Sequence, residues 1–324
     1  MSLTAGAGER PDVVTVGEAM VAFRADGPVV QGGTQTTRLA GSESNVAIGL
    51  ARLGHRVEWA GRVGADAFGD LVLRELRAEG VGTTHAAADP ERPTGLMFVT
   101  QRTADLSSVH YRRSGSAGSA LGPADVADAL TTAPRFLHLT GITPALSDSA
   151  RESVTVLVDL AVAAGVRVSL DVNYRSRLWT REQARAVLAP LSDRAFVVIA
   201  SEDELDLVSA SPATEADLAA SLLSRGVHQV AVKRGVRGAS VYTADARQDA
   251  SALAVTAVDP MGAGDAFCAG YLSGLLDGLD PAGCLGRGTV GGAFVASSLG
   301  DWEGAPTRAE LDLLHDHVPG ESIR

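Results

Sequence analysis

A glycine-rich turn followed by an acid carries the residue types needed for phosphoryl transfer. Residues 258–267, VDPMGAGDAF, have the pattern of a strand that leads through a glycine turn into an apolar helix. Gly262, Ala263 and Gly264 would bring backbone N–H groups close to an anion at the positive end of the helix dipole. Asp265 falls in the first helical turn, where the dipole favours the carboxylate, so it is a weak but well-placed candidate base.

The same turn has other interpretations. It can be an ordinary tight turn that leads into a helix with an acidic first turn. A dinucleotide-binding loop is disfavoured because Phe267 stands where that pattern requires glycine or alanine, and no acidic ribose ligand follows at the next strand end. A P-loop is disfavoured as well, since GxxxxGK followed by Ser or Thr does not occur in the chain.

The bulk composition limits the class of protein. The chain has 324 residues, of which 45% are hydrophobic and 21% charged, and this predicts one main α/β domain over residues 12–318. A net charge of -11 disfavours a nucleic-acid partner, and no apolar run is long enough to span a membrane. Without a signal-peptide pattern we expect a cytoplasmic protein, with flexible termini over residues 1–11 and 319–324.

The elements that must position the turn follow a βαβ rhythm. Short runs rich in Val, Ile and Leu alternate with longer amphipathic stretches, and they predict strands over residues 13–17, 136–140, 166–173, 196–200 and 229–233. Capping boxes start helices at Thr180, Ser201 and Thr307. We therefore predict a doubly wound, mostly parallel sheet with helices on both faces.

Two segments break this rhythm. Residues 19–39 and 94–113 alternate polar and apolar residues without helical spacing, which predicts a separate small β-sheet. A sheet placed over the carboxyl ends of the main strands would act as a lid that excludes water from a phosphoryl-transfer site.

Several motifs resemble those of the ribokinase-like (PfkB-type) carbohydrate kinases. Residues 259–265 are similar to the GAGD signature of that family, residues 41–47 (GSESNVA) to its N-terminal substrate segment, and residues 61–66 (GRVGAD) to its next signature. Within the family the motifs are most similar to those of 2-keto-3-deoxygluconate kinases, through residues 111–117, 171–175, 233–235 and 300–306.

The resemblance implies a ribokinase-like fold with a β-sheet lid and ATP- and Mg²⁺-dependent phosphorylation of a sugar hydroxyl. It makes Asp265 the base and the backbone at Gly262, Ala263 and Gly264 the anion hole. The implied substrate contacts, together with Asp265, are Gly41, Asn45, Tyr111, Arg113 and Arg175. The implied nucleotide contacts are Asn173, Ser201, Lys233, Gly235, Gly238, Gly262, Gly264 and Thr289.

The chain departs from the family pattern at a few positions. Thr289 replaces an asparagine near the adenine, so the contacts to adenine are left open, and Ser201 replaces the asparagine of an Asn-x-x-Glu segment. Pro260 and Met261 replace threonines, which leaves a monovalent cation beside the loop open as well. Glu204 matches an acid that supports the magnesium indirectly, but Ser-x-x-Glu is equally a capping box.

The pair Arg113 and Arg175 favours an acid sugar, because a guanidinium can bind a planar carboxylate at two points. Salt bridges at the surface are the alternative for both arginines. We predict a kinase that converts 2-keto-3-deoxygluconate to its 6-phosphate. A family member for a neutral sugar (fructose, ribose) or a nucleoside, a non-catalytic sugar-binding protein and, more remotely, an oxidoreductase remain alternatives. Edge pairing of the lid and the family resemblance favour a homo-oligomer.

Overall fold

The computed structural model describes residues 10–27, 32–103, 106–209, 214–311 and 313. The predicted flexible termini lie outside these residues except for residues 10 and 11, as does the predicted domain end at 318. The main sheet is built from β1 (Val13–Val16), β4 (Val57–Gly64), β5 (Ala86–Asp89), β8 (Phe136–Thr140), β9 (Arg167–Asp171), β10 (Val197–Ser201), β11 (Gln229–Lys233), β12 (Ala239–Tyr242) and β13 (Arg247–Ala250).

In the described part of the chain these strands form one sheet in the order β13-β12-β11-β10-β9-β8-β1-β4-β5. Every pairing from β11 across to β5 is parallel, whereas β12 and β13 add antiparallel strands at one edge. The mostly parallel sheet predicted from the alternating pattern is confirmed. Parallel strands place their carboxyl ends at the same edge, and ligands of α/β proteins bind there.

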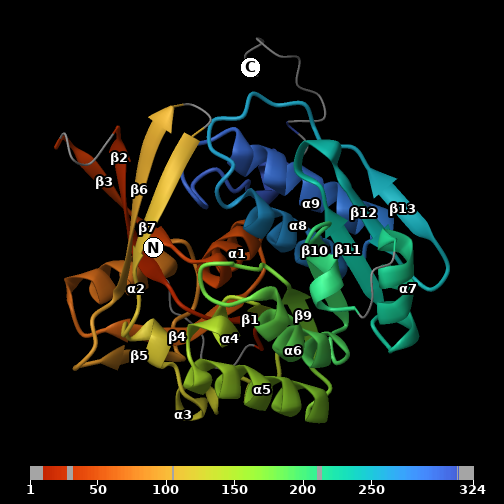
Figure 1. Ribbon diagram of the computed structural model, residues 1–324, viewed down its shortest axis with the longest axis horizontal. Helices are drawn as coiled ribbons and strands as arrows, with labels where there is room; N and C mark the ends of the chain where they lie inside the picture. Colours follow the sequence, from red (N-terminus) through yellow and green to blue (C-terminus); the bar gives the residue numbers. More distant parts are fainter. Residues whose placement is uncertain (1–9, 28–31, 104–105, 210–213, 312, 314–324) are drawn as a thin grey trace.

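Helices cover both faces of the sheet (Figure 1). Their bounds are α1 (Ser42–Arg52), α2 (Ala67–Ala78), α3 (Pro123–Val126), α4 (Thr143–Leu146), α5 (Asp148–Ala163), α6 (Arg181–Ser192), α7 (Glu215–Ser224), α8 (Ala263–Asp277) and α9 (Pro281–Ala296). Short 3₁₀ helices span Gly118–Ala120 (η2), Leu205–Leu207 (η3), Gly235–Arg237 (η4) and Arg308–Glu310 (η5). In Figure 1 α5 and α6 lie at the bottom of the view, and α8 and α9 lie toward the top.

The period-two alternation of the strands divides the core between these two layers. Val198 and Ala200 of β10 pack in one cluster with residues of α5, α6 and α7. Val197 and Ile199 of the same strand pack in a second cluster with residues of α1, α2, α8 and α9. Both faces of β10 are therefore buried, which explains why its sequence is a continuous apolar run.

Local signals set several helix ends. Thr180 and Thr307 form the predicted capping boxes at the starts of α6 and η5. At Ser201 the prediction is only partly right, because η3 starts after Glu204 and the Ser201 side chain caps nothing. Glu204 instead uses its carboxylate at the ends of two strands, as described below.

The predicted small sheet is confirmed and is here called the lid. Among the described residues it contains β2 (Met20–Asp26), β3 (Gln35–Ala40), β6 (Gly95–Thr103) and β7 (Leu106–Arg112) in the order β3-β2-β6-β7. Its inner face buries Met20, Ala22, Ala40, Met97 and Val99 in a small core of their own. Figure 1 shows these strands standing away from the main sheet, beside α1 and α2.

Candidate active site

The acid of the glycine turn is held by the first turn of another helix. Asp265 lies in the first turn of α8 and is buried. Its Oδ1 accepts a hydrogen bond from Ser42 Oγ at 2.7 Å, and its Oδ2 accepts one from Asn45 Nδ2 at 2.8 Å. Ser42 and Asn45 are three residues apart in α1, so they face the acid from one side of that helix.

Burial raises the pKa of Asp265, while the hydrogen bonds from Ser42 and Asn45 oppose the rise. The place of Asp265 in the first helical turn predicts that the helix dipole holds this acid ionised. A dipole contributes about 1 kcal/mol near a surface, whereas full burial shifts a carboxyl pKa by up to about 3–5 units, so burial prevails. A raised pKa makes Asp265 a better proton acceptor than an exposed aspartate.

The N-terminus of α8 has the geometry of an anion site. Gly262 is in the left-handed conformation (φ 79°), and no side chain caps the helix. A Cβ at Gly262 would lie 1.7 Å from the carbonyl oxygen of Asp301, so the turn requires glycine there. A Cβ at Gly264 would meet only Lys233 Nζ, at 3.6 Å. The fold therefore does not require a glycine at 264, and the space beside its backbone is open to a ligand.

This difference gives a prediction for Gly264→Ala. The free energy of unfolding should stay the same or rise by up to about 1 kcal/mol, because alanine favours a helix more than glycine does. The new methyl group would stand where a phosphoryl group approaches, so kcat/KM for ATP should fall about tenfold or more. Urea unfolding and initial rates measure the two effects.

Gly286→Ala in α9 is the matched control, because a Cβ there also meets open space. It should share the stability gain and keep full activity. Equal activity of the two variants would show that Gly264 does not adjoin the phosphoryl group.

The predicted substrate contacts near α1 are in place beside the acid. Gly41 precedes α1 with φ 151°, and a Cβ there would lie 2.5 Å from the carbonyl oxygen of Glu18. Asn45 holds Asp265 with its amide nitrogen, and its Oδ1 is buried without a partner in the described structure. A buried carbonyl oxygen without a donor is costly, and a sugar hydroxyl would satisfy it.

The two arginines predicted to bind a carboxylate differ in their surroundings. Arg175 is exposed, and its Nη1 donates to the carbonyl oxygen of Tyr174 at 3.3 Å. No carboxylate in the described ranges forms an ion pair with it, and its charge lowers the pKa of Asp265. The guanidinium of Arg175 therefore forms no ion pair among the described residues, and its charge acts on the candidate base.

Arg113, by contrast, is already paired. Its Nε and Nη2 donate to Glu18 Oε2 at 2.7 and 2.5 Å, and Glu18 also accepts from Ser116 Oγ. Its guanidinium carbon lies 5.4 Å from the ring centroid of Tyr111, which packs against the lid core. The two arginines that were predicted to bind one substrate carboxylate together therefore differ, because the guanidinium of Arg113 is paired with Glu18. Arg113 supports Tyr111, and Arg175 alone is free for a carboxylate.

The predicted nucleotide contacts lie along the carboxyl ends of β9, β10 and β11. Asn173 follows β9 with φ 39°, and its Nδ2 donates to Ser42 Oγ at 2.8 Å, so it adjoins the acid. Ser201 ends β10. Thr289 lies in α9, where its hydroxyl donates to the carbonyl oxygen of Gly286 at 2.7 Å. Asn173 and Ser201 thus follow or end strands of the main sheet, whereas Thr289 lies on α9.

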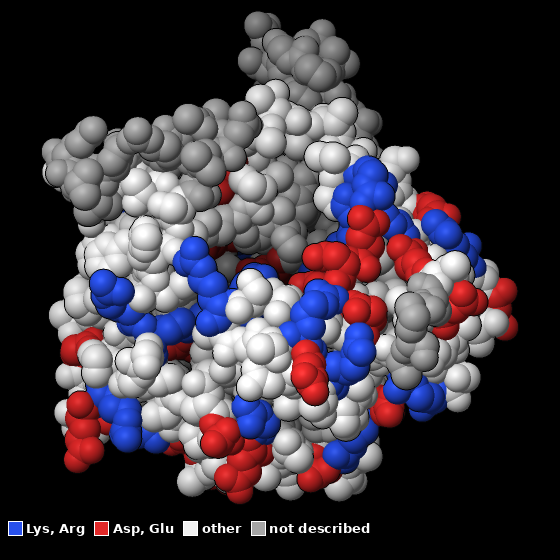
Figure 2. Space-filling model, viewed as in Figure 1, with Lys and Arg blue, Asp and Glu red and all other residues white. Residues whose placement is uncertain are grey.

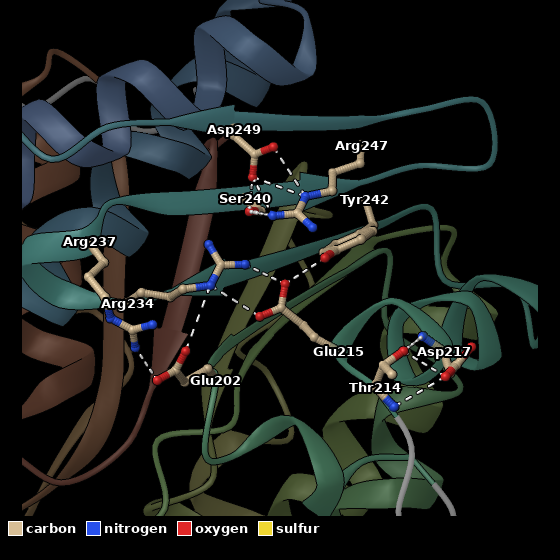
Figure 3. Close-up of polar contacts among 10 residues, drawn as sticks. All are labelled: Glu202, Thr214, Glu215, Asp217, Arg234, Arg237, Ser240, Tyr242, Arg247 and Asp249. Carbon is tan, nitrogen blue, oxygen red and sulfur yellow. Dashed lines mark hydrogen bonds and ion pairs between the residues drawn. The ribbon is translucent and has the colours of Figure 1, made fainter.

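The loop with Gly235 and Gly238 is held by a network of charges (Figure 3). Arg234 Nε donates to Glu215 Oε2 at 3.1 Å and lies 3.8 Å from Glu202 Oε2, and Arg237 pairs with Glu202. Glu202 follows β10 and Glu215 starts α7, so the network ties the loop to both elements. The sequence analysis did not identify these partners.

Lys233 does not point into this loop. Its Nζ lies 2.9 and 3.0 Å from the two oxygens of Asp171, whose side chain is 1% exposed. Burial alone would lower the pKa of Lys233, but the adjacent Asp171 carboxylate outweighs it and raises the pKa. Cys268 Sγ also lies 3.3 Å from Asp171 Oδ2. The ammonium group lies near Gly264 of the α8 turn, and it donates to both oxygens of Asp171 and, at 3.9 Å, to Cys268 Sγ.

The carboxylate of Glu204 accepts hydrogen bonds from backbone N–H groups. Its two carboxylate oxygens accept from the N–H of Tyr174 at 2.7 Å and the N–H of Ser201 at 2.8 Å. It thereby ties the ends of β9 and β10 together, a variant of the capping alternative. No cluster of three or more His, Cys, Asp or Glu in the described ranges could hold a metal ion.

The surface around the site carries both signs of charge. Figure 2 shows a hollow near the centre of this face, where acidic and basic side chains meet. Basic and acidic side chains both occur elsewhere on this face, with basic ones gathered to the left of the hollow in this view. Among the described residues, no helix combines the length and the apolar character that crossing a membrane requires.

Comparison with known proteins agrees with this geometry. Residues 10–308 match the model of the pfkB family carbohydrate kinases. A 2-dehydro-3-deoxygluconokinase of Bacillus subtilis (strain 168) is 38% identical, covering 93% of this chain and 94% of that protein. One of the same name from Thermoproteus tenax is 33% identical, over 93% of each. A 5-dehydro-2-deoxygluconokinase of Listeria monocytogenes serotype 4b (strain CLIP80459) is 29% identical, over 97% and 98%.

Among solved structures, an E. coli protein in complex with ATP and Mg²⁺ matches this chain with a TM-score of 0.89 and 27% identity. The match covers 94% of this chain and 99% of the E. coli chain. The family match spans nearly all of the described fold, including the lid, the α1 segment and the α8 turn. The chain therefore belongs to the pfkB family of carbohydrate kinases and is a phosphotransferase that acts on an alcohol group.

Proposed function

We propose that the protein phosphorylates 2-keto-3-deoxygluconate (2-dehydro-3-deoxygluconate) at its 6-hydroxyl, with MgATP as donor, to give 2-keto-3-deoxy-6-phosphogluconate. The observation that carries the substrate class is Arg175, an exposed guanidinium without a carboxylate partner in the described structure, whose charge acts on Asp265. A sugar acid has a carboxylate at one end for Arg175 and a hydroxyl at the other end for Asp265. The names of the relatives at 38% and 33% identity support the same substrate.

The residues divide the reaction between them. Asp265 orients the terminal hydroxyl and accepts its proton as the oxygen bonds to the γ-phosphorus of ATP, while the bond from that phosphorus to the bridging oxygen breaks and ADP leaves. The backbone N–H groups of the Gly262–Ala263–Gly264 turn stabilise the charge on the transferring group. Ser42 and Asn45 fix the carboxylate, and Arg175 fixes the far end of the acid. When bound, Mg²⁺ would neutralise charge on the nucleotide phosphates.

The names of other relatives suggest a second candidate substrate, 5-dehydro-2-deoxygluconate. The 29% identical relatives are named for 5-dehydro-2-deoxygluconate, which is also a sugar acid, so Arg175 alone does not separate the two. Fructose, ribose and nucleosides lack the carboxylate and fit the site less well. A protein without catalytic activity is disfavoured, because the candidate base Asp265 is present and its carboxylate is oriented by hydrogen bonds from Ser42 and Asn45.

The test is ADP release from purified protein with MgATP and each of 2-keto-3-deoxygluconate, 2-keto-3-deoxygalactonate, 5-dehydro-2-deoxygluconate, fructose, ribose and adenosine. We expect the largest kcat/KM with 2-keto-3-deoxygluconate. A preference for a neutral sugar would overturn the substrate and leave the kinase assignment in place. Mass determination in solution would test the proposed homo-oligomer, since β3 and β7 are the edge strands of the lid.

The role of Arg175 gives a separate prediction. Arg175→Ala should raise KM for the sugar acid about ten- to a hundredfold with little change in kcat, because it removes a charge-assisted contact to the substrate alone. Arg112→Ala is the matched control, because Arg112 is an exposed arginine of the lid whose side chain donates to the carbonyl oxygen of Tyr111 and forms no ion pair among the described residues. An equal rise of KM for fructose would contradict carboxylate recognition.

A further inference from the structure

One lid residue reaches the loop that forms the anion site. Arg24 belongs to β2, and its guanidinium lies between two carboxylates from other parts of the chain. Its Nη1 is 2.7 Å from Asp301 Oδ1, and its Nη2 pairs with Asp259. The Arg24 side chain is 14% exposed, and the two aspartates are 8% exposed.

Both aspartates contact the turn before α8. Asp259 Oδ1 accepts a hydrogen bond from the N–H of Met261 at 3.1 Å. The carbonyl oxygen of Asp301 packs against Gly262 so closely that no Cβ fits between them. The guanidinium of Arg24 therefore joins the two segments that enclose the turn, and it does so from the lid.

A positive charge is required at this place. Two buried carboxylates repel one another unless one takes up a proton or a cation lies between them. Burial raises the pKa of Asp301 to about 7, the Arg24 charge opposes the rise, and the Asp265 charge adds to it. Loss of the guanidinium would thus disturb both aspartates and, through them, the turn that they hold.

We propose that Arg24 is a positioning residue that couples the lid to the anion site, its guanidinium supplying the cation that lets Asp259 and Asp301 hold the Gly262 turn in phosphoryl-binding geometry. Measuring the effect of Arg24 through kcat rests on the proposed kinase function.

The test compares Arg24→Ala with Arg38→Ala. Arg38 is on β3 of the same lid and pairs with Glu303 at 3.1 Å, but it is 51% exposed and contacts neither Asp259 nor Asp301. Arg24→Ala should lower kcat about ten- to a hundredfold, because small displacements of a phosphoryl site are costly. Arg38→Ala should retain nearly all of the wild-type kcat.

A cation supplied from solution distinguishes positioning from simple packing. Millimolar guanidinium or potassium chloride should restore a large part of the activity of Arg24→Ala, relative to choline chloride at the same ionic strength, and should not raise the activity of wild type. Arg24→Lys, which keeps the charge but loses the two-point contact, should fall between wild type and Arg24→Ala. If Arg24→Ala does not fold, the comparison of Arg24→Lys with Arg38→Ala carries the test.

Wild-type kcat in Arg24→Ala would overturn the proposal, as would a loss that equals that of Arg38→Ala and responds to no cation. Failure of the proposed function is recognised separately, because wild type would then release no ADP with any sugar acid. In that case MgATP binding by calorimetry replaces turnover, and the proposal still requires weaker binding by Arg24→Ala than by Arg38→Ala.

Discussion

Replacement of Asp265 by asparagine is expected to lower kcat by about 10²- to 10⁴-fold, because the amide cannot accept the proton of the attacking hydroxyl. The Kd for MgATP should change little, since the backbone of the turn, and not this carboxylate, contacts the phosphates in the proposed reaction. Steady-state kinetics and calorimetry with MgATP measure the two quantities. An unchanged kcat would contradict the role of Asp265 as base.

The variant should still fold. The Oδ1 of Asn45 has no partner in the described structure, so a flip of that amide would let Asn45 accept from the new amide at position 265. Removing a buried carboxylate whose pKa is raised by burial also removes a desolvation cost. Urea unfolding of Asp265→Asn should therefore give a free energy at or above that of wild type, which separates loss of chemistry from loss of structure.

The pH dependence of kcat reports the same group. A base must be deprotonated, so activity is present above the pKa of Asp265 and is lost as pH falls through it. Because burial raises that pKa, the acid limb should lie above the ordinary value of 3.8. Glu43 in α1 is fully buried, and burial raises its pKa to about 7. Its titration could therefore also produce an acid limb above pH 3.8. Glu43→Gln is the control, and an acid limb that vanishes in this variant belongs to Glu43.

Much of the fold could be predicted because its signals are local. The strand over residues 229–233 and the caps at Thr180 and Thr307 were predicted at the observed positions. Each depends on residues a few places apart, such as an apolar run or a Thr with a glutamine or glutamate three residues on. The lid was predicted in the same way, since a period of two separates its strands from helices.

The pairing of the charged side chains could not be predicted. Arg113 binds Glu18, 95 residues away in the sequence, and Arg24 binds Asp301, 277 residues away. A single sequence carries no local signal for such contacts, because the topology of the sheet alone brings the segments together. For this reason the two arginines predicted for one carboxylate have different surroundings, and Arg24 received no role. Ser42, by contrast, lay within the GSESNVA segment, and its helical spacing from Asn45 could have indicated its contact with the acid.

Lys233→Met is expected to lower the free energy of unfolding by about 3–5 kcal/mol, because it leaves the Asp171 carboxylate buried without its counter-ion. Asp171 is 1% exposed, and both of its oxygens lie within 3.0 Å of Lys233 Nζ. Urea unfolding monitored by circular dichroism measures the change. Arg237→Met is the matched control, because that cation pairs with Glu202 at the surface and its loss should cost less than about 1 kcal/mol.

The double variant Asp171→Asn with Lys233→Met separates the two roles that Lys233 can have. It removes both charges, so it should recover most of the lost stability, since replacing a buried pair costs far less than breaking it. If Lys233 acts only through Asp171, the affinity for MgATP returns together with stability. If its ammonium also acts on the phosphates from beneath Gly264, as the resemblance implied, stability returns while the affinity stays low. A stable double variant that still binds MgATP weakly would thus place Lys233 among the nucleotide contacts. Its ammonium group would then act on the phosphates in addition to its hydrogen bonds to Asp171 and Cys268.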